Sequence, residues 1–538
     1  MTPQSNGGAT ELARAVVSAL VEAGVTEVVI APGSRNAPLS FAAYDAAAAG
    51  LLRLHTRIDE RSAGFLALGL TRVGARAAVM CTSGTAVANL HPAVLEAAHT
   101  GLPLVAVTAD RPARLRGTGA NQTTDQVGIL GPLVATVDLA ESAQVDAAGL
   151  AAAAGPTHWN VQLDEPLVPD GRWRPADVRR ADQPRATRPG GRAGTPRRLP
   201  LGPRTVVVAG DDAGPPARIL AERAGWPLLA EPTSGSRTGA NAVRCYRLLL
   251  GTDLGDRVQR VVVAGHPTLS RPVTRLLARD DVEVVTTTAA GVWARRPFPV
   301  DHHVEGPVEA DGTDDPAWLE EWRTADRSVG RRLDALLAAE ADLTPYDVAG
   351  AVSRVLPAGG LLHVGASSPI RDLDLMVPRY AVGDRRKVIA NRGLAGIDGT
   401  VSAAIGAALG RPWSSRALAL MGDVTFLHDA GGLVLGPREA RPDLTIVVVN
   451  DDGGSIFSML EQGAEEYAEP FDTLFGTPHG VDLASLCAAT RTPHWRVDSL
   501  PELEHALANP NGGIEVVEAV VRRDNRRDLD ARIRALRP

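Results

Sequence analysis

The chain alternates short apolar, β-rich runs with stretches of helical character along most of its length. EVVIAPGSR, AAVMCTSGT and LPLVAVTADRP show this rhythm near the N-terminus, and RTVVVAGD and RVVVAGHP repeat it farther along. It returns a third time from LLHVGAS onward. Buried strands separated by helices are typical of a parallel sheet with helices on its faces. We therefore predict an α/β protein of three tandem doubly wound parallel-sheet domains.

Length and changes of composition suggest where the domains end. A chain of 538 residues is too long for one core, and about three domains are expected. Residues 171–204 are rich in Arg and Pro, which suggests either a nucleic-acid patch or a solvated linker. Apart from Trp173, the stretch has no aromatic residues between its arginines, so we favour the linker. The predicted domains are 1–180, 200–335 and 343–538.

Lysine is almost absent from the chain. Of the 56 Lys and Arg residues only Lys387 is a lysine, and it lies in the hydrophilic run GDRRKV. A P-loop needs Gly-Lys-Ser/Thr, and a Schiff-base enzyme needs an activated lysine. The sequence therefore argues against ATP hydrolysis at a P-loop and against pyridoxal-phosphate chemistry.

We expect neither an export signal nor a membrane-spanning run in this sequence. Its apolar runs fall short of the roughly 20 residues that a span needs, and MTPQSNGGATELARAVV lacks a basic-then-apolar pattern. The three cysteines, Cys81, Cys245 and Cys487, show neither metal spacing nor a disulfide framework. We expect a cytoplasmic protein with no nucleic-acid partner.

Two predicted strands near the C-terminus end in oxygen-bearing side chains. ALALMGDVTF reaches Asp423, and LTIVVVNDDGG ends in Asn450-Asp451-Asp452-Gly453. A right-handed crossover would bring both strand ends to the carboxyl edge of a parallel sheet. Oxygen ligands beside a Gly-rich loop suit Mg²⁺ (or Mn²⁺) holding a diphosphate. Two ordinary strand-to-helix turns would give the same pattern, so the motif alone leaves both interpretations open.

The spacing of these residues resembles the Gly-Asp-Gly and Asn-Asn diphosphate motif of thiamin-diphosphate enzymes. Asn450 lies 27 residues after Asp423, but Val424 replaces the second glycine and Asp451 stands where a second Asn is common. Counting forward from Asp423 places Asn450 at the ligand position of the motif. Counting back from Ile456 instead places Asp451 there, as if the connection were one residue longer. The residues that the resemblance implies for cofactor and metal are Gly422, Asp423, Asp451 and Gly453, with Asn450 as the alternative ligand.

Glu60, in HTRIDERSAGFLALG, lies between a predicted strand and a predicted helix. The helix dipole alone favours an acid there. The segment also resembles the activating-glutamate segment of thiamin-diphosphate enzymes, in which a buried carboxylate bonds the aminopyrimidine ring and promotes loss of the cofactor's reactive proton. The resemblance implies that Glu60 is catalytic and binds the cofactor, that the first domain holds the pyrimidine and that the third holds the Mg-diphosphate. The middle domain is then structural or regulatory.

A more specific resemblance rests on segments in both outer domains. They are APGSRNAPL (31–39), HTRIDERSAGFLALG (55–69), TSGTAVANLHPAV (82–94), TADRP (108–112), GANQTTDQ (119–126), NRGLAGIDGT (391–400) and GGSIF (453–457). These resemble 2-succinyl-5-enolpyruvyl-6-hydroxy-3-cyclohexene-1-carboxylate synthases of menaquinone biosynthesis. The resemblance implies isochorismate and 2-oxoglutarate as substrates, with release of CO₂.

The same resemblance assigns substrate residues. It places Ser34, Arg35, Arg111 and Gln122 on the isochorismate side, and Ser367, Arg371 and Arg392 on the 2-oxoglutarate side. Ile397 matches the apolar wedge that bends the cofactor, and Ile456 and Phe457 would line the acceptor pocket. Both substrates are dianions, and arginine binds carboxylates bidentately. Any one arginine could serve surface solubility alone, but four on predicted strand-to-helix loops favour binding.

Two alternative functions are considered, one of them another thiamin-diphosphate enzyme and the other a non-catalytic protein. An acetolactate synthase or simple 2-oxo acid decarboxylase would accept pyruvate, against which the arginine set argues. A catalytically dead scaffold paralogue would not need both Glu60 and Asp423. Because carboxylates on separate domains must act on one cofactor, we expect a homodimer or a dimer of dimers with interfacial active sites.

Overall fold

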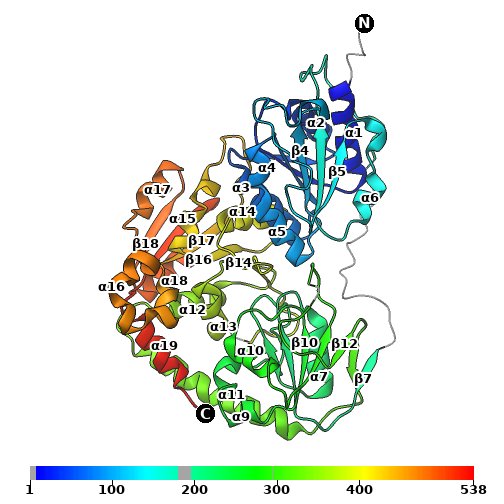
Figure 1. Cartoon of the computed structure of the whole chain (residues 1–538). Helices are drawn as coiled ribbons and strands as arrows, with labels where there is room; N and C mark the ends of the chain where they lie inside the picture. The colour runs from blue at the N-terminus through cyan, green and yellow to red at the C-terminus, as the bar shows by residue number, and fades with distance from the viewer. Residues whose placement is uncertain (1–7, 180–195, 294, 378) are drawn as a thin grey trace. The chain divides into compact units, whose positions relative to one another are not determined.

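The computed structural model describes residues 8–179, 196–293, 295–377 and 379–538 (Figure 1). The chain forms two compact units. The first contains Met1–Ala186, Asp398–Trp413 and His428–Pro442, and the second contains Thr187–Ile397, Ser414–Leu427 and Asp443–Pro538. In the described residues, three parallel sheets of five or six strands, with flanking helices, confirm the predicted fold class. The boundaries of the three domains stay a prediction.

The first unit is built on a six-stranded parallel sheet of order β2-β1-β3-β4-β6-β5. Its strands are β1 (Glu27–Ile30), β2 (Arg53–Thr56), β3 (Ala77–Cys81), β4 (Val105–Asp110), β5 (Ala135–Leu139) and β6 (Thr157–Gln162). Its helices include α1 (Gly8–Glu22), α2 (Ala37–Ala48), α3 (Glu60–Arg72), α4 (Thr85–Asn89), α5 (His91–Thr100) and α6 (Ala147–Ala152). Every residue of β1, β3 and β4 is buried, as expected for central strands covered on both faces.

Helix α3 packs tightly on α14 (Thr400–Gly410) within this unit. All residues of α14 are buried, and so is α3 from Ser62 onward. Glycines make the close approach possible. A Cβ on Gly69 would lie 2.0 Å from the carbonyl oxygen of Ala403, and one on Gly406 would lie 2.1 Å from that of Leu66. This contact fixes the helix that begins at Glu60.

The second unit begins with what we call the middle segment, residues 197–338. Its five-stranded parallel sheet has the order β12-β11-β10-β8-β9. The strands are β8 (Thr205–Ala209), β9 (Leu228–Ala230), β10 (Arg260–Ala264), β11 (Glu283–Thr287) and β12 (His302–Val304). The helices are α7 (Pro215–Ala224), α8 (Tyr246–Leu249), α9 (Asp253–Asp256), α10 (Arg271–Leu277) and α11 (Pro316–Ala338).

Both described ends of the predicted linker belong to folded parts of the chain, so the linker is shorter than expected. Trp173 packs on the core of the first unit, and its backbone N–H donates to Asp45 at 2.8 Å. At the other end, β7 (Arg197–Leu199) pairs in parallel with β13 (Val308–Ala310). Residues 180–195 lie outside the described chain. The Arg- and Pro-rich composition therefore does not mark one continuous solvated stretch.

The third sheet, also in the second unit, has the order β15-β14-β16-β17-β19-β18 and is parallel throughout. Its strands are β14 (Leu361–Val364), β15 (Lys387–Ile389), β16 (Ala417–Gly422), β17 (Leu444–Asn450), β18 (His494–Val497) and β19 (Ile514–Val520). The helices around it are α12 (Pro345–Val355), α13 (Ser368–Met376), α15 (Asp423–His428), α16 (Ala468–Phe471), α17 (Leu483–Ala489), α18 (Leu500–Ala508) and α19 (Arg526–Arg534). Lys387 opens β15 and is half-buried rather than fully solvated.

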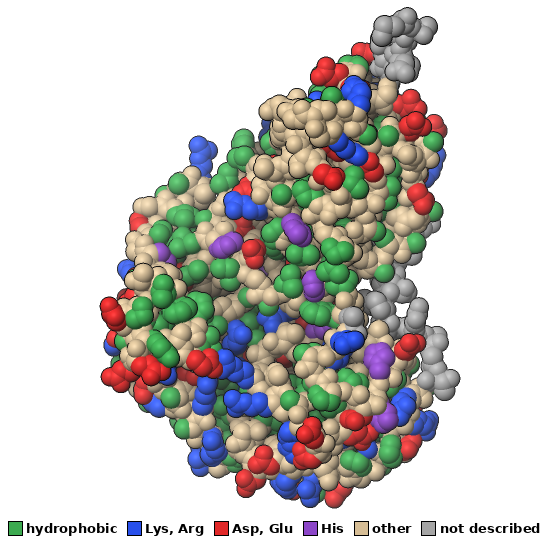
Figure 2. All heavy atoms as spheres, in the orientation of Figure 1, with side chains coloured by type: hydrophobic (Ala, Val, Ile, Leu, Met, Phe, Trp, Pro, Cys, Tyr) green, Lys and Arg blue, Asp and Glu red, His purple; other side chains and the backbone are tan. Residues whose placement is uncertain are grey.

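Acidic and basic side chains are intermixed on the face shown in Figure 2. Exposed arginine and carboxylate side chains also form ion pairs, such as Arg327 with Glu320, 2.7 Å apart. Within the described residues, no helix combines the length and apolar character of a membrane span.

Candidate functional site

The ends of β16 and β17 form the predicted diphosphate edge. The strands pair in parallel with Gly422 opposite Val449, so the residues that follow them emerge side by side. Asp423 and Asp451 line one cavity of about 130 Å³. The other predicted residues that line it are Ser367, Ile397, Gly422, Gly453, Ile456 and Phe457. The structure thus brings most of the residues predicted for this edge together.

The two aspartates suit a cation. Asp423 is buried, and burial raises the pKa of its carboxyl. Asp451 is partly buried, and burial together with the charge of Asp423 raises its pKa to about 7. A divalent ion would favour the ionised form of both carboxyls. Among the described residues no three His, Cys, Asp or Glu side chains converge as a metal site, so a backbone carbonyl and the diphosphate would have to complete the ligand set.

The two candidate ligands on β17 differ in their surroundings. Asn450 donates to Glu518 Oε1 at 2.7 Å and accepts from the N–H of Asp452 at 3.0 Å, so its amide faces other partners. Asp451, by contrast, lines the cavity. This arrangement favours Asp451 over Asn450. Gly453 has φ +142°, and a Cβ there would lie 2.1 Å from the carbonyl oxygen of Gly476.

Three polar residues at this edge were not predicted from the sequence. His479 Nε2 lies 3.1 Å from Asp423 Oδ2. The Ser368 hydroxyl and the Nε and Nη1 of Arg526 are buried without a hydrogen-bond partner in the described chain, and both residues line the cavity. A bound diphosphate would supply acceptors for such donors. No local motif marks His479 or Arg526, because 56 and 103 residues separate them from Asp423.

The residues predicted for the 2-oxo acid lie near the same edge. Arg371 is in the first turn of α13, which corrects the predicted loop position, and its Nη1 donates to the carbonyl oxygen of Ser367. Ser367 precedes this helix with φ 72°. Burial, and then the charges of Arg392 and Arg247, lower the pKa of Arg371. Arg392 is buried, and its Nη2 donates to Thr268 Oγ1 at 2.6 Å. These arginines form a positive cluster suited to carboxylates.

The residues predicted for isochorismate follow strands of the first sheet. Arg111 Nη1 donates to Ser83 Oγ at 2.9 Å and to the carbonyl oxygen of Gln122 at 2.8 Å. Gln122 Nε2 donates to the Ser83 carbonyl at 3.0 Å, so Ser83, which was not predicted, joins the two. Burial, and then the charge of Arg35, lower the pKa of Arg111. Ser34 is exposed on the connection from β1 to α2.

Glu60 is the first residue of α3, with Asp59 as the N-cap. Its side chain is partly buried, and Asn89 Nδ2 lies 3.5 Å from its Oε2. The carboxylate therefore stands at the positive end of a buried helix and can still accept a further hydrogen bond. Glu60 belongs to the first unit, whereas Asp423 and Asp451 belong to the second.

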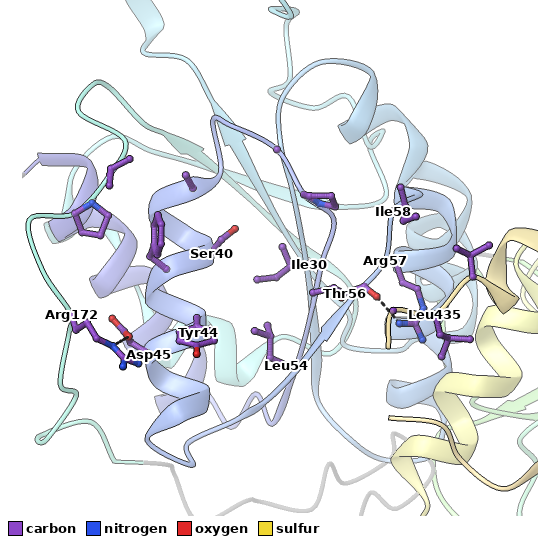
Figure 3. A pocket seen from close by; sticks show the side chains of 18 of the residues that line it. Ile30, Ser40, Tyr44, Asp45, Leu54, Thr56, Arg57, Ile58, Arg172 and Leu435 are labelled. Atoms are coloured by element: carbon purple, nitrogen blue, oxygen red, sulfur yellow. Dashed lines mark hydrogen bonds and ion pairs between the residues drawn. The ribbon is translucent and has the colours of Figure 1, made fainter. Parts of the chain in front are cut away.

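A large apolar hollow of about 1030 Å³ lies beside the stretch that leads to Glu60. Figure 3 shows Tyr44, Leu54 and Ile58 around it. Tyr44 is 57% exposed and Ile58 73% exposed, which is unusual for side chains of this kind. Arg57 also lines the hollow and contacts Glu439 at 3.2 Å, but its Nε and Nη2 find no partner among the described residues.

Comparison with known proteins gives consistent results. The N-terminal binding domain of thiamine pyrophosphate enzymes matches residues 10–129, and the C-terminal binding domain matches 374–517. The chain is 75% identical over 538 residues to a 2-succinyl-5-enolpyruvyl-6-hydroxy-3-cyclohexene-1-carboxylate synthase of a Nocardioides species, with 98% of each chain covered. It is 47% identical to the synthase of the same name from Kineococcus radiotolerans, again over 98% of each chain.

A solved structure shares the fold. Benzoylformate decarboxylase from Polynucleobacter necessarius superposes with a TM-score of 0.66, covering 95% of this chain and 98% of that one. The two sequences are 17% identical, so this likeness concerns the fold alone.

Proposed function

The chain belongs to the 2-succinyl-5-enolpyruvyl-6-hydroxy-3-cyclohexene-1-carboxylate synthase family of thiamine pyrophosphate enzymes, and from this premise we propose that it joins 2-oxoglutarate to isochorismate in menaquinone biosynthesis. In the proposed reaction, 2-oxoglutarate loses CO₂, and the carbon that carried the carboxylate forms the new carbon–carbon bond with isochorismate as one proton is taken up. The observation that carries the proposal is 75% identity across 98% of the chain.

Thiamin diphosphate, when bound, supplies the carbon nucleophile and accommodates the electron pair that remains when CO₂ leaves. We assign Asp423, Asp451 and the Gly453 carbonyl as ligands of Mg²⁺ (or Mn²⁺), with Gly422 beside the diphosphate. The shared cavity and the raised pKa of both aspartates support this assignment. Ile397, which lines the same cavity, would hold the cofactor in its bent conformation.

Glu60 is the proposed catalytic residue. Its carboxylate would hold a proton at the pyrimidine ring nitrogen, which activates the cofactor. Its place at the start of a helix that is fixed by close packing supports this role, because a proton-transfer group must be held in position.

The arginines are the proposed carboxylate binders. Arg371 and Arg392, with Ser367, would hold 2-oxoglutarate, and their mutual proximity supports this assignment. Arg35 and Arg111, with Ser34 and Gln122, would hold isochorismate, supported by the hydrogen bonds that join Arg111 to Gln122. Ile456 and Phe457 would line the acceptor pocket and keep water from it.

We propose a homodimer or dimer of dimers in which a second copy of the chain covers the apolar hollow. The stretch from Thr56 to Ile58 forms part of the hollow and runs directly into Glu60, so a partner seated there would lie beside the start of the helix that carries the proposed catalytic carboxylate. Such a partner would remove exposed Tyr44 and Ile58 from water. Interfacial active sites and a cytoplasmic location stay predictions.

A CO₂-release assay tests the proposed reaction. Purified protein with thiamin diphosphate and Mg²⁺ should release CO₂ from 2-oxoglutarate and form the joined product only when isochorismate is present. Pyruvate should be a poor substrate, because it lacks the second carboxylate that the arginines bind. Efficient turnover of pyruvate would favour the acetolactate synthase-like alternative. Cofactor binding without any CO₂ release would favour the dead paralogue.

A further inference from the structure

Residues of the middle segment hold both arginines that we assign to 2-oxoglutarate. The first case is Arg392, whose Nη2 donates to Thr268 in the loop between β10 and α10. The neighbouring N–H of Leu269 donates to Glu231 Oε1 at 2.9 Å. Glu231 is 2% exposed at the end of β9, so this loop is anchored on a buried carboxyl of the middle sheet.

The second case is Arg371, and here the contact is with the backbone. Arg247, from α8, donates through Nη1 to the carbonyl oxygen of Arg371 at 2.7 Å. Its Nη1 also lies 3.5 Å from Asp374 Oδ2. Asp374 is fully buried in α13, where it accepts from Tyr246 Oη at 2.9 Å and from Arg237 Nη1 at 2.9 Å. Three side chains of the middle segment, Arg237, Tyr246 and Arg247, thus bind to α13, the helix that carries Arg371.

The charges explain why such anchoring matters. The charges of Arg392 and Arg247 lie close enough to Arg371 to lower its pKa, so these like charges need contacts that hold them together. The Nε of Arg392 is buried with no partner among the described residues, which leaves a donor for a ligand. A carboxylate binds best to guanidinium groups that are already in place, because little ordering then remains to be done.

We propose that the middle segment is the positioning scaffold for the 2-oxo acid. Thr268, braced by Glu231, fixes the guanidinium of Arg392, and Arg247 fixes the turn of α13 that carries Arg371. Thr268 and Arg247 are positioning residues, since they act through the two arginines. The inference rests on the assignment of Arg371 and Arg392 in the proposed function.

Thr268→Val tests the first contact in the full-length holoenzyme. Thr268 is exposed, so the substitution removes one hydroxyl without leaving a cavity. We expect the KM for 2-oxoglutarate to rise roughly 5–10-fold, the net effect of losing one typical hydrogen bond. The kcat, the KM for isochorismate and the affinity for thiamin diphosphate should stay within about twofold, since Thr268 touches none of those groups. Thr268→Ser keeps the hydroxyl and should restore the KM.

Thr286→Val is the matched control. Thr286, in β11, also makes one side-chain hydrogen bond, to His303 Nδ1 at 3.1 Å, and should leave the KM for 2-oxoglutarate unchanged. Arg247→Met tests the second contact independently, because it removes the donor to the Arg371 carbonyl and keeps much of the side-chain volume. It too should raise the KM for 2-oxoglutarate, by roughly tenfold, with the KM for isochorismate unchanged.

Arg392→Ala separates the two levels of the argument. If Arg392→Ala raises the KM for 2-oxoglutarate and both Thr268→Val and Arg247→Met leave it unchanged, the positioning role is overturned and the substrate assignment stands. If Arg392→Ala itself leaves that KM unchanged, the substrate assignment fails and the inference fails with it. Equal losses for both substrates in Thr268→Val would indicate general damage and would also overturn the positioning role.

Discussion

The first and third sheets share one strand order but carry different chemistry at their carboxyl edges. Counted along the chain within each sheet, both follow the order second, first, third, fourth, sixth, fifth, with every pair parallel. After their first strands both sheets present a serine and an arginine, Ser34 with Arg35 and Ser367 with Arg371. The resemblance ends at the third and fourth strands.

The residues that follow the third and fourth strands differ between the two sheets. In the first sheet they are followed by Ser83 and Arg111, which bond each other. In the third sheet they are followed by Asp423 and Asp451, which line one cavity. Under the proposed assignments, the same topology therefore supplies an anion-binding edge in the first sheet and a cation-binding edge in the third, and the residues after the third and fourth strands make the difference. Glu60, after the second strand of the first sheet, has Arg392 as its counterpart in the third.

Of these variants, Glu60→Gln should have the largest effect. A small effect would contradict the chemistry that the comparison of the two sheets assigns to the first sheet. Gln keeps the shape of the side chain but cannot exchange a proton at the pyrimidine ring, so kcat should fall by roughly 10²–10⁴. Thiamin diphosphate should still bind within a few-fold of wild type, as calorimetry can measure. Near-normal turnover at saturating cofactor would remove Glu60 from the mechanism.

Asp423→Ala should fail at an earlier stage, because the third sheet would lose one of its proposed metal ligands. We expect the affinity for thiamin diphosphate with Mg²⁺ to fall by at least about 100-fold, with partial recovery at high concentrations of both. Calorimetric titration of the metal-free protein is the measurement, and Glu60→Gln is the control that retains binding. Wild-type affinity in Asp423→Ala would mean that the metal site lies elsewhere.

The paired arginines after the first strands permit a sharper comparison. Arg371→Ala should impair CO₂ release from 2-oxoglutarate, whereas Arg35→Ala should leave that step nearly intact and raise the isochorismate concentration required. Each loss should cost about 2–4 kcal/mol in kcat/KM for the substrate concerned, because a carboxylate loses its partner. Single-turnover measurements separate the two steps. Failure of both variants at one step would contradict the division of labour between the sheets.

Gly69→Ala should give the smallest effect and acts on stability. The new Cβ would meet a backbone carbonyl of α14, which cannot move as a flexible side chain can, so unfolding free energy should fall by about 1–3 kcal/mol. Gly155→Ala, where a Cβ would meet open space, serves as the control in denaturant unfolding. Equal stability of the two variants would show that the contact between α3 and α14 is looser than described.

The sequence predicted the local patterns well and the long-range contacts poorly. Strands β16 and β17 end where the apolar runs end, because burial on both faces requires continuous apolar residues. The choice of Asp451 over Asn450 as metal ligand rested on sequence spacing. The hydrogen bonds that occupy the amide of Asn450 also favour Asp451. Arg371 was expected in a loop but lies in α13, since helix starts are poorly fixed by sequence.

Other residues could not have been found from the sequence. Thr268 meets Arg392 across 124 residues, and His479 meets Asp423 across 56. Such pairs are set by how whole elements pack, and no spacing rule connects them. The roles assigned to the site residues stay predictions until the variants are measured.

The packing of α14 against α3 has a practical consequence for dissecting the protein. The first unit takes residues 398–413 and 428–442 from far along the chain, so it is not a continuous stretch of the gene product. A fragment ending near residue 180 would lack α14 and leave the apolar side of α3 bare to water. We expect that fragment to aggregate on expression, whereas a version that appends α14 through a flexible tether should stay dispersed.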